Sequence, residues 1–197
     1  MSSNSVSAHL VRIPVSDRVG TYACHQKVYE ACGRNSRPLW RRCPGYVLAL
    51  SREKPDGYST RPYSPTPRVG QTTRFDLLAE LSVAKKKDGG ERGRRCDPIL
   101  EARLVNPRRS YAELAAEFGR PWLERQGAQH GFDVLDLDRC EYEVIEFVRA
   151  GKRVRLGAVR LNGTLRVTNA DRFASAMLNG IGHGKAWGCG LLLCFGT

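Results

Sequence analysis

Residues 153–195 have the sequence RVRLGAVRLNGTLRVTNADRFASAMLNGIGHGKAWGCGLLLCF. The part from 153 to 167 is strand-like, and the Asn162-Gly163 pair inside it is typical of a hairpin turn. Asn169 can cap a helix that runs on to residue 179. A glycine-rich loop follows, and Leu191 to Phe195 predict a closing strand. The end of the chain is therefore expected to be a β-α-β arrangement.

The preceding residues predict the rest of this unit. Phe75 to Ala84 alternate in polarity, which indicates a strand. A helix is expected from Tyr111 to Phe118, ending at Gly119, with a separate helical turn starting at Pro121. Asp133 to Arg149 are strand-like and lead through a tight turn at Gly151-Lys152 into the next strand. The order β-α-β-β-α-β is that of a ferredoxin-like domain.

The first part of the chain has a shorter version of the same order. The expected elements are a strand, a helix, two strands and a loop, over residues 7–15, 17–32, 39–42, 46–51 and 52–70. The predicted fold class is therefore α+β, with two tandem ferredoxin-like (RRM-like) domains. We place them at residues 1–70 and 71–197, with a reduced second helix in the first.

Charge and composition limit the function. The chain carries 32 Lys+Arg against 20 Asp+Glu, a net charge of +12, and both predicted domains are basic. Such a field attracts polyanions, so nucleic acid is the expected partner. No apolar run is long enough for a membrane span, and the polar N-terminus does not look like a signal peptide. We therefore expect a cytoplasmic protein with no membrane partner.

The cysteines do not suggest a metal centre. The chain has 7 cysteines and 4 histidines, and no C-x-x-C pair occurs. Reduced thiols in a cytosolic protein are the expected state. We predict no metal site and no small-molecule cofactor.

The glycine-rich loop over residues 180–190 is the most specific motif. It is not a Walker A loop, because Lys185 is followed by alanine rather than Ser or Thr. It is not a dinucleotide loop either, since it follows a helix and precedes a strand. Two interpretations remain, a purely structural turn and a cradle for an RNA strand. The candidate RNA-binding residues of this loop are Gly182, His183, Gly184, Lys185 and Trp187.

Tyr22 and His25 form a second candidate site. Their i, i+3 spacing places both on one face of the first predicted helix. A histidine can accept or donate a proton near neutral pH, and a tyrosine can hydrogen-bond a phosphate or a ribose hydroxyl. RNA supplies its own nucleophile, the 2′-OH, so its cleavage requires no metal. The alternative for a lone helical histidine is a structural role.

Basic residues gather in further places. Each could be solvated surface, but the arginine bias of the set favours phosphate recognition. The candidate RNA contacts outside the loop are Arg41, Arg42, Lys85, Lys86, Lys87, Arg94, Arg95, Arg108 and Arg109.

Together these motifs resemble the CasE family, the CRISPR RNA repeat endoribonucleases of Cascade-type systems. Tyr22 to Gln26 (YACHQ) are similar to the family's Tyr-x-x-His on its first helix, and 180–193 (GIGHGKAWGCGLLL) are similar to its glycine-rich loop and final strand. Ala79-Glu80-Leu81 stand where the family usually has Ala-Asn-Pro, and the region 52–70 is short. A type I-E system and a type IV system both fit.

The resemblance implies a function and its residues. It implies binding of the repeat hairpin of CRISPR RNA, metal-independent cleavage at the 3′ base of the stem, and 2′,3′-cyclic phosphate and 5′-hydroxyl ends. His25 would transfer the proton, with Tyr22 as its partner. The protein would stay on the product with other subunits of a CRISPR effector complex. The alternatives are a hairpin-binding assembly subunit without catalysis and a general RNA chaperone.

Overall fold

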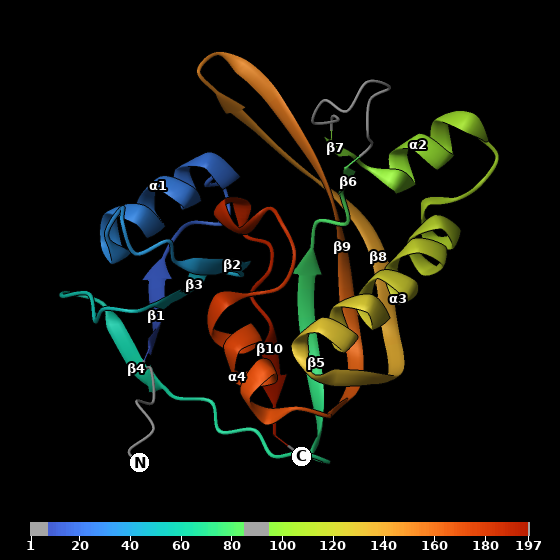
Figure 1. Cartoon of the computed structure of the whole chain (residues 1–197). Helices are drawn as coiled ribbons and strands as arrows, with labels where there is room; N and C mark the ends of the chain where they lie inside the picture. The colour runs from blue at the N-terminus through green and yellow to red at the C-terminus, as the bar shows by residue number, and fades with distance from the viewer. Residues whose placement is uncertain (1–7, 85–94, 197) are drawn as a thin grey trace, which may run out of the picture.

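A computed structural model describes residues 8–84 and 95–196 and contains two four-stranded antiparallel sheets (Figure 1). The first sheet has the strand order β2-β3-β1-β4. Its strands are β1 (Ala8–Pro14), β2 (Leu39–Cys43), β3 (Tyr46–Ser51) and β4 (Ser59–Tyr63). Helix α1 (Thr21–Cys32) covers one face, and no second helix separates β3 from β4. This is the ferredoxin-like strand order with its second helix missing.

The core of the first sheet follows from the strand and helix periodicities of its sequence. Val11 and Ile13 alternate on the inner face of β1, while Cys24, Val28 and Cys32 recur every fourth residue on α1. These side chains pack together into one buried cluster. Burial of this helix stripe fixes which side of α1 remains accessible.

The second sheet has the order β10-β5-β9-β8. Its strands are β5 (Thr72–Ala79), β8 (Phe132–Arg149), β9 (Lys152–Val167) and β10 (Leu193–Phe195), and its helices are α3 (Tyr111–His130) and α4 (Ala170–Asn179). In chain order, β5, α3, β8, β9, α4 and β10 form the complete β-α-β-β-α-β unit. The predicted fold class, two tandem ferredoxin-like domains with a reduced first one, is confirmed.

The segment between β5 and α3 holds further elements. A two-stranded ladder joins β6 (Val83–Ala84) to β7 (Arg95–Cys96), and α2 (Pro98–Val105) follows it. The sequence prediction did not include α2. It also extended the strand of β5 to residue 84, which is wrong because β5 ends at Ala79.

The predicted hairpin turn at Asn162-Gly163 is wrong. Both residues lie inside the continuous strand β9, where Gly163 pairs with Phe75 on β5. A Cβ on Gly163 would meet the Asp136 carbonyl oxygen at 2.0 Å, next to a register shift in β8. Close backbone approach therefore explains this glycine. The chain reverses at Ala150-Gly151, one residue before the turn predicted at Gly151-Lys152, and both residues have positive φ, as a type I′ hairpin turn requires.

Three other boundaries differ from the prediction. Helix α3 does not end at Gly119 but runs through Pro121, because residues on both sides of it, such as Leu114 and Leu123, are buried on the sheet. Helix α1 starts at Thr21 rather than Asp17, whose carboxylate accepts a hydrogen bond from the Gly45 amide. The predicted loop 52–70 contains β4.

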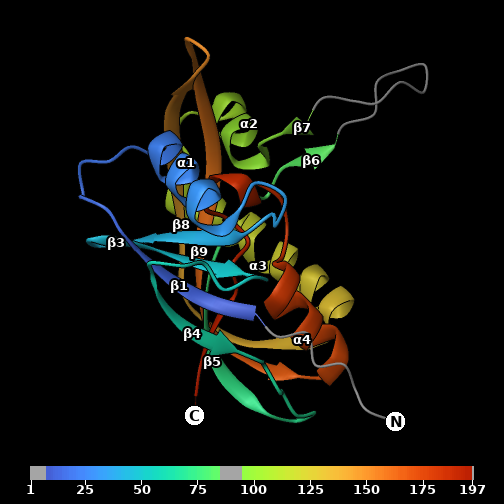
Figure 2. The same cartoon turned by 90° about the vertical axis from the view of Figure 1, so that its left-hand side faces the viewer.

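The first sheet ends at Tyr63 and the second begins at Thr72, while the domain limits 1–70 and 71–197 stay a prediction. The glycine-rich loop, with its short 3-10 helix η1 (Lys185–Trp187), lies between the two sheets beside α1 (Figures 1 and 2). No helix within the described ranges is long and apolar enough to span a bilayer.

Candidate active site

His25 projects from α1 onto the glycine-rich loop. Its Nδ1 lies 2.9 Å from the carbonyl oxygen of Ala186, a residue of η1. The same oxygen accepts a hydrogen bond from Nε1 of Trp40 on β2, at 3.1 Å. The Ala186 carbonyl thus accepts hydrogen bonds from two rings. It connects α1, which the sequence predicts to carry the catalytic residues, to the glycine-rich loop near the end of the chain.

This contact defines the tautomer of the His25 imidazole, that is, which ring nitrogen carries the proton. A carbonyl oxygen can only accept, so Nδ1 of His25 carries the proton in this hydrogen bond. In the neutral ring, Nε2 then has the free lone pair. A histidine oriented in this way can remove a proton from a group placed at Nε2 and return it later in the reaction.

Aromatic rings surround His25. Its ring centroid lies 4.3 Å from that of Tyr29, 4.7 Å from Trp187 and 6.1 Å from Tyr22. Phe147 on β8 stacks on Trp187 at 4.1 Å and lies 6.5 Å from Tyr22. The structure therefore brings Tyr22, His25 and Trp187 together, as residues from both domains.

The glycine-rich loop is wedged between two tryptophans. A Cβ on Gly188, which has φ +90°, would lie 3.1 Å from the Trp40 ring. On its other side the loop packs against Trp122 of α3 at Gly182. This tight packing supports the structural interpretation of the glycines, and it holds Ala186 in position for His25.

The candidate RNA contacts of this loop face two different cavities. Trp187 lines a cavity of about 690 Å³ between the two sheets. Gly182, His183 and Lys185 line a second cavity of about 460 Å³, which lies against α3. These four loop residues are therefore divided between two sides, Gly184 lines neither cavity, and RNA binding by the loop stays a prediction.

Lys185 is hydrogen-bonded to the backbone at the end of α4. Its Nζ donates to the carbonyl oxygens of Asn179 and Gly180, at 2.7 and 3.0 Å, where α4 ends. A cation is favourable at a helix C-terminus. Burial lowers the pKa of Lys185. Its predicted contact with a phosphate stays a prediction.

Two histidines line the smaller cavity. Burial, together with the nearby charge of Arg95, lowers the pKa of His183. Burial and the charge of Lys185 lower the pKa of His130. Both imidazoles are therefore biased toward the neutral form, and they can act as hydrogen-bonding groups rather than as cations.

The candidate arginines have different surroundings. Arg41 is buried, and its Nη2 lies 2.5 Å from Asp76 on β5 of the second sheet. Arg42 is exposed and donates to the backbone carbonyl of Asp17. Arg95 and Arg108 are exposed, whereas Arg109 is paired with Glu117, which raises its pKa. Lys85, Lys86, Lys87 and Arg94 lie outside the described residues.

The sequence prediction missed a basic surface at the tip of the β8–β9 hairpin. The hairpin projects beyond the rest of the second sheet, beside α1 (Figures 1 and 2). Its exposed cations are Arg149, Lys152, Arg153 and Arg155, and we call them the hairpin-tip cations. Arg149 also lies over the Trp187 ring at 5.8 Å. The charges and the turn were visible in the sequence, but nothing in the sequence showed that this hairpin tip projects beside α1.

Metal binding has no visible basis in the part of the chain that is described. Within residues 8–84 and 95–196, no three His, Cys, Asp or Glu side chains come together as ligands. The seven cysteines are all free thiols.

Known proteins resemble this chain over nearly its whole length. The CRISPR-associated endoribonuclease Cse3 of Thermus thermophilus is 28% identical over an alignment 209 residues long. The alignment covers 89% of this chain and 90% of Cse3. A solved structure of Thermus thermophilus Cse3, bound to an RNA representing a pre-cleavage complex, matches with 25% identity and a TM-score of 0.67. That match covers 96% of this chain and 99% of the other.

A chain of a CRISPR RNA-guided surveillance complex shares the fold, with 20% identity, a TM-score of 0.63 and coverage of 96% of this chain and 100% of the other. The family model described as CRISPR associated protein matches residues 9–194. The resemblance to CRISPR repeat endoribonucleases is thereby confirmed, and this chain belongs to the CRISPR associated protein family.

Proposed function

We propose that this protein cuts the repeat hairpin of CRISPR RNA at the 3′ base of the stem and remains bound to the product. The observation that carries the proposal is the hydrogen bond from His25 to the Ala186 carbonyl, which leaves Nε2 as the proton acceptor. The similarity to Cse3, a CRISPR-associated endoribonuclease, supports the choice of reaction.

The reaction needs one proton acceptor and one proton donor. Nε2 of His25 takes the proton of the ribose 2′-OH, and the 2′-oxygen attacks the adjacent phosphorus. The bond from phosphorus to the 5′-oxygen breaks, and that oxygen receives the proton that Nε2 of His25 took up. The products are a 2′,3′-cyclic phosphate and a 5′-hydroxyl. Tyr22 orients the scissile phosphate or the 2′-OH from the same face of α1. Because the RNA supplies the nucleophile, no metal is required.

The stem binds through its shape and its phosphates. The β8–β9 hairpin projects beside α1, and the hairpin-tip cations give it positive charge. One of them, Arg149, lies over the Trp187 ring, which is 4.7 Å from the His25 ring. Exposed Arg42, Arg95 and Arg108 are further candidates for phosphate contact. Many phosphate contacts make product release slow, so we expect a single turnover per protein. The protein then acts in the cytoplasm, as a subunit of a CRISPR effector complex.

The test is cleavage of the cognate repeat RNA in EDTA, with wild type against His25→Ala and with binding measured in parallel at fixed salt. We expect the wild type to cut and the variant to bind without cutting. Tyr29→Phe, a change on the same helix face, is the matched control and should cut like the wild type. If His25→Ala cuts at the wild-type rate, the assignment is refuted. If the wild type and both variants bind and none of them cuts, the protein is a hairpin-binding assembly subunit.

A further inference from the structure

The 690 Å³ cavity lies where the two domains face each other. It is lined by β2 of the first sheet, by β8 and β9 of the second sheet, and by Trp187 and Gly188 of the glycine-rich loop. Its size lies within the range of small-ligand sites, about 300 to 1,000 Å³. Trp187 forms part of its wall, and the same ring lies 4.7 Å from His25. The cavity therefore opens next to the proposed cleavage residue.

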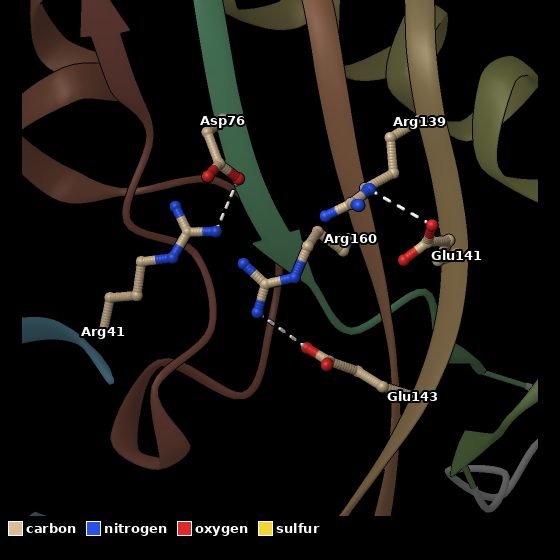
Figure 3. A network of polar contacts seen from close by, with 6 residues as sticks. All are labelled: Arg41, Asp76, Arg139, Glu141, Glu143 and Arg160. Carbon is tan, nitrogen blue, oxygen red and sulfur yellow. Dashed lines mark hydrogen bonds and ion pairs between the residues drawn. The ribbon is translucent and has the colours of Figure 1, made fainter. Parts of the chain in front are cut away.

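Two guanidinium groups define the polar part of this cavity. Arg41 reaches in from β2 and Arg160 from β9, and Figure 3 shows them pointing toward one another. Each is held by one carboxylate, Arg41 by Asp76 at 2.5 Å and Arg160 by Glu143 at 3.2 Å. Two cations on facing walls attract an anion between them, and guanidinium groups suit phosphate oxygens.

Arg41 is the more informative of the two. Its side chain is only 4% exposed, and its Nη1 is buried with no hydrogen-bond partner among the described residues. A buried charged donor normally has a partner for each N–H group. Arg41 thus lines the cavity and keeps an unpaired donor just beneath its surface, so a small side-chain movement would bring that donor to a ligand.

The other walls suit a nucleobase. Leu78, Val144 and Ile145 give an apolar surface. Glu143 pairs with Arg160 and Glu146 with Arg155, and each carboxylate has further acceptor positions at the same cavity. Unpaired RNA bases are bound in this way, with the ring on an apolar or aromatic surface and the amino groups on acceptors. A phosphate alone would not explain the apolar walls, whereas one nucleotide explains both parts.

We propose that this interdomain cavity binds the nucleotide that follows the scissile phosphate, with the 3′-phosphate of that nucleotide between Arg41 and Arg160 and its base on the apolar wall. The inference rests on the proposed cleavage at the 3′ base of the stem, since the chain then continues past His25 in the downstream direction. The ligand class is an unpaired ribonucleotide covalently continuous with the hairpin. Arg41 and Arg160 are binding residues in this proposal.

The test uses RNA that cannot be cut. Three repeat hairpins with a 2′-deoxy group before the scissile phosphate are compared. The first ends in that phosphate, and the second continues by one downstream nucleotide that carries a 3′-phosphate. The third ends like the first and carries an extra phosphorylated nucleotide at its 5′ end. Affinity is measured at fixed salt. For the wild type, the downstream nucleotide should tighten binding by roughly tenfold, and the 5′ nucleotide should have no such effect.

Arg160→Gln should lose this gain. Arg166→Gln is the matched control, because Arg166 on β9 pairs with Asp133 on β8 at 3.1 Å but does not line the cavity. Should Arg160→Gln unfold, the double change Arg160→Gln and Glu143→Gln removes both charges and keeps the comparison possible. No gain in the wild type, or the same gain in Arg160→Gln, overturns the proposal.

The two proposals fail in different ways. Cleavage of unmodified repeat RNA by the wild type tests the reaction, while the 2′-deoxy RNA tests the cavity alone. A protein that does not cut, yet gains affinity from the downstream nucleotide, would lose the proposed activity and keep the nucleotide site. A protein that cuts without this gain would keep the activity and lose the site.

Discussion

Replacing Trp40 by phenylalanine should slow cleavage, although Trp40 is not one of the proposed catalytic residues. Trp40 is 2% exposed, and its Nε1 donates to the same Ala186 oxygen that orients His25. Phenylalanine keeps an aromatic ring in the core but removes this donor and the outer part of the indole that packs at Gly188. The carbonyl would then be held by His25 alone, and the loop would gain freedom to move away from α1.

The expected size follows from these contacts. A neutral hydrogen bond contributes about 1 kcal/mol net, and shrinking a buried indole leaves a small cavity. We expect a loss of about 2 kcal/mol in the free energy of unfolding, which for a chain of this size lowers Tm by roughly 4 to 8 °C. If about 1 kcal/mol of the loss comes from the orientation of His25, the cleavage rate falls roughly fivefold.

The assay is single-turnover cleavage at saturating RNA, so that binding does not limit the rate. Trp122→Phe is the matched control, because Trp122 is also buried and packs on the same loop at Gly182, away from His25. It should lose similar stability and cleave at the wild-type rate. Equal rates for Trp40→Phe and the wild type would refute the view that the Ala186 carbonyl positions the imidazole.

Three further changes test other parts of the structure. Lys185→Met removes two hydrogen bonds at the end of α4 and should lower the free energy of unfolding, measured by urea denaturation, by about 1 to 2 kcal/mol. If the variant instead shows a smaller salt dependence of RNA binding, Lys185 contacts a phosphate. Arg153→Gln at the hairpin tip should weaken RNA binding and reduce the slope of log Kd against log salt by about 1, whereas Arg139→Gln on the same hairpin but away from its tip should not. The pKa of His183 is lowered in the folded state, so the unfolded state binds more protons below about pH 6.5. Stability should therefore fall as the pH falls from 7 to 5, and His183→Gln should flatten this dependence of Tm on pH.

Local periodicity predicted the order of most elements, but it missed β4, β6, β7 and α2 and misplaced several limits. Alternation and i, i+4 spacing identified β1, α1 and the strands of the second sheet. The errors arose where distant contacts override local preference. Gly119 and Pro121 remain helical because α3 is buried on the second sheet, and Gly163 is placed by the close approach of β8 rather than by a turn.

The site shows a similar division. The i, i+3 spacing correctly placed Tyr22 and His25 on one helix face, since that relation is local. The Ala186 carbonyl lies 161 residues further along the chain, and a backbone acceptor leaves no trace in the sequence. In the sequence, nothing distinguishes Arg41 from its neighbour Arg42. In the structure Arg41 is buried on β2 and paired with Asp76, whereas Arg42 is exposed.

The geometry of His25 makes the proposed activity depend on the contact between domains. The imidazole belongs to α1 of the first domain, whereas the oxygen that fixes its tautomer belongs to the loop before β10 of the second. Trp40 and the Arg41 ion pair with Asp76 connect the same two domains beside it. Each domain alone would have either the base or its orienting group, but not both. A correctly oriented Nε2 therefore exists only when the domains are docked, and the cavity between them, proposed for the downstream nucleotide, is formed by the same docking.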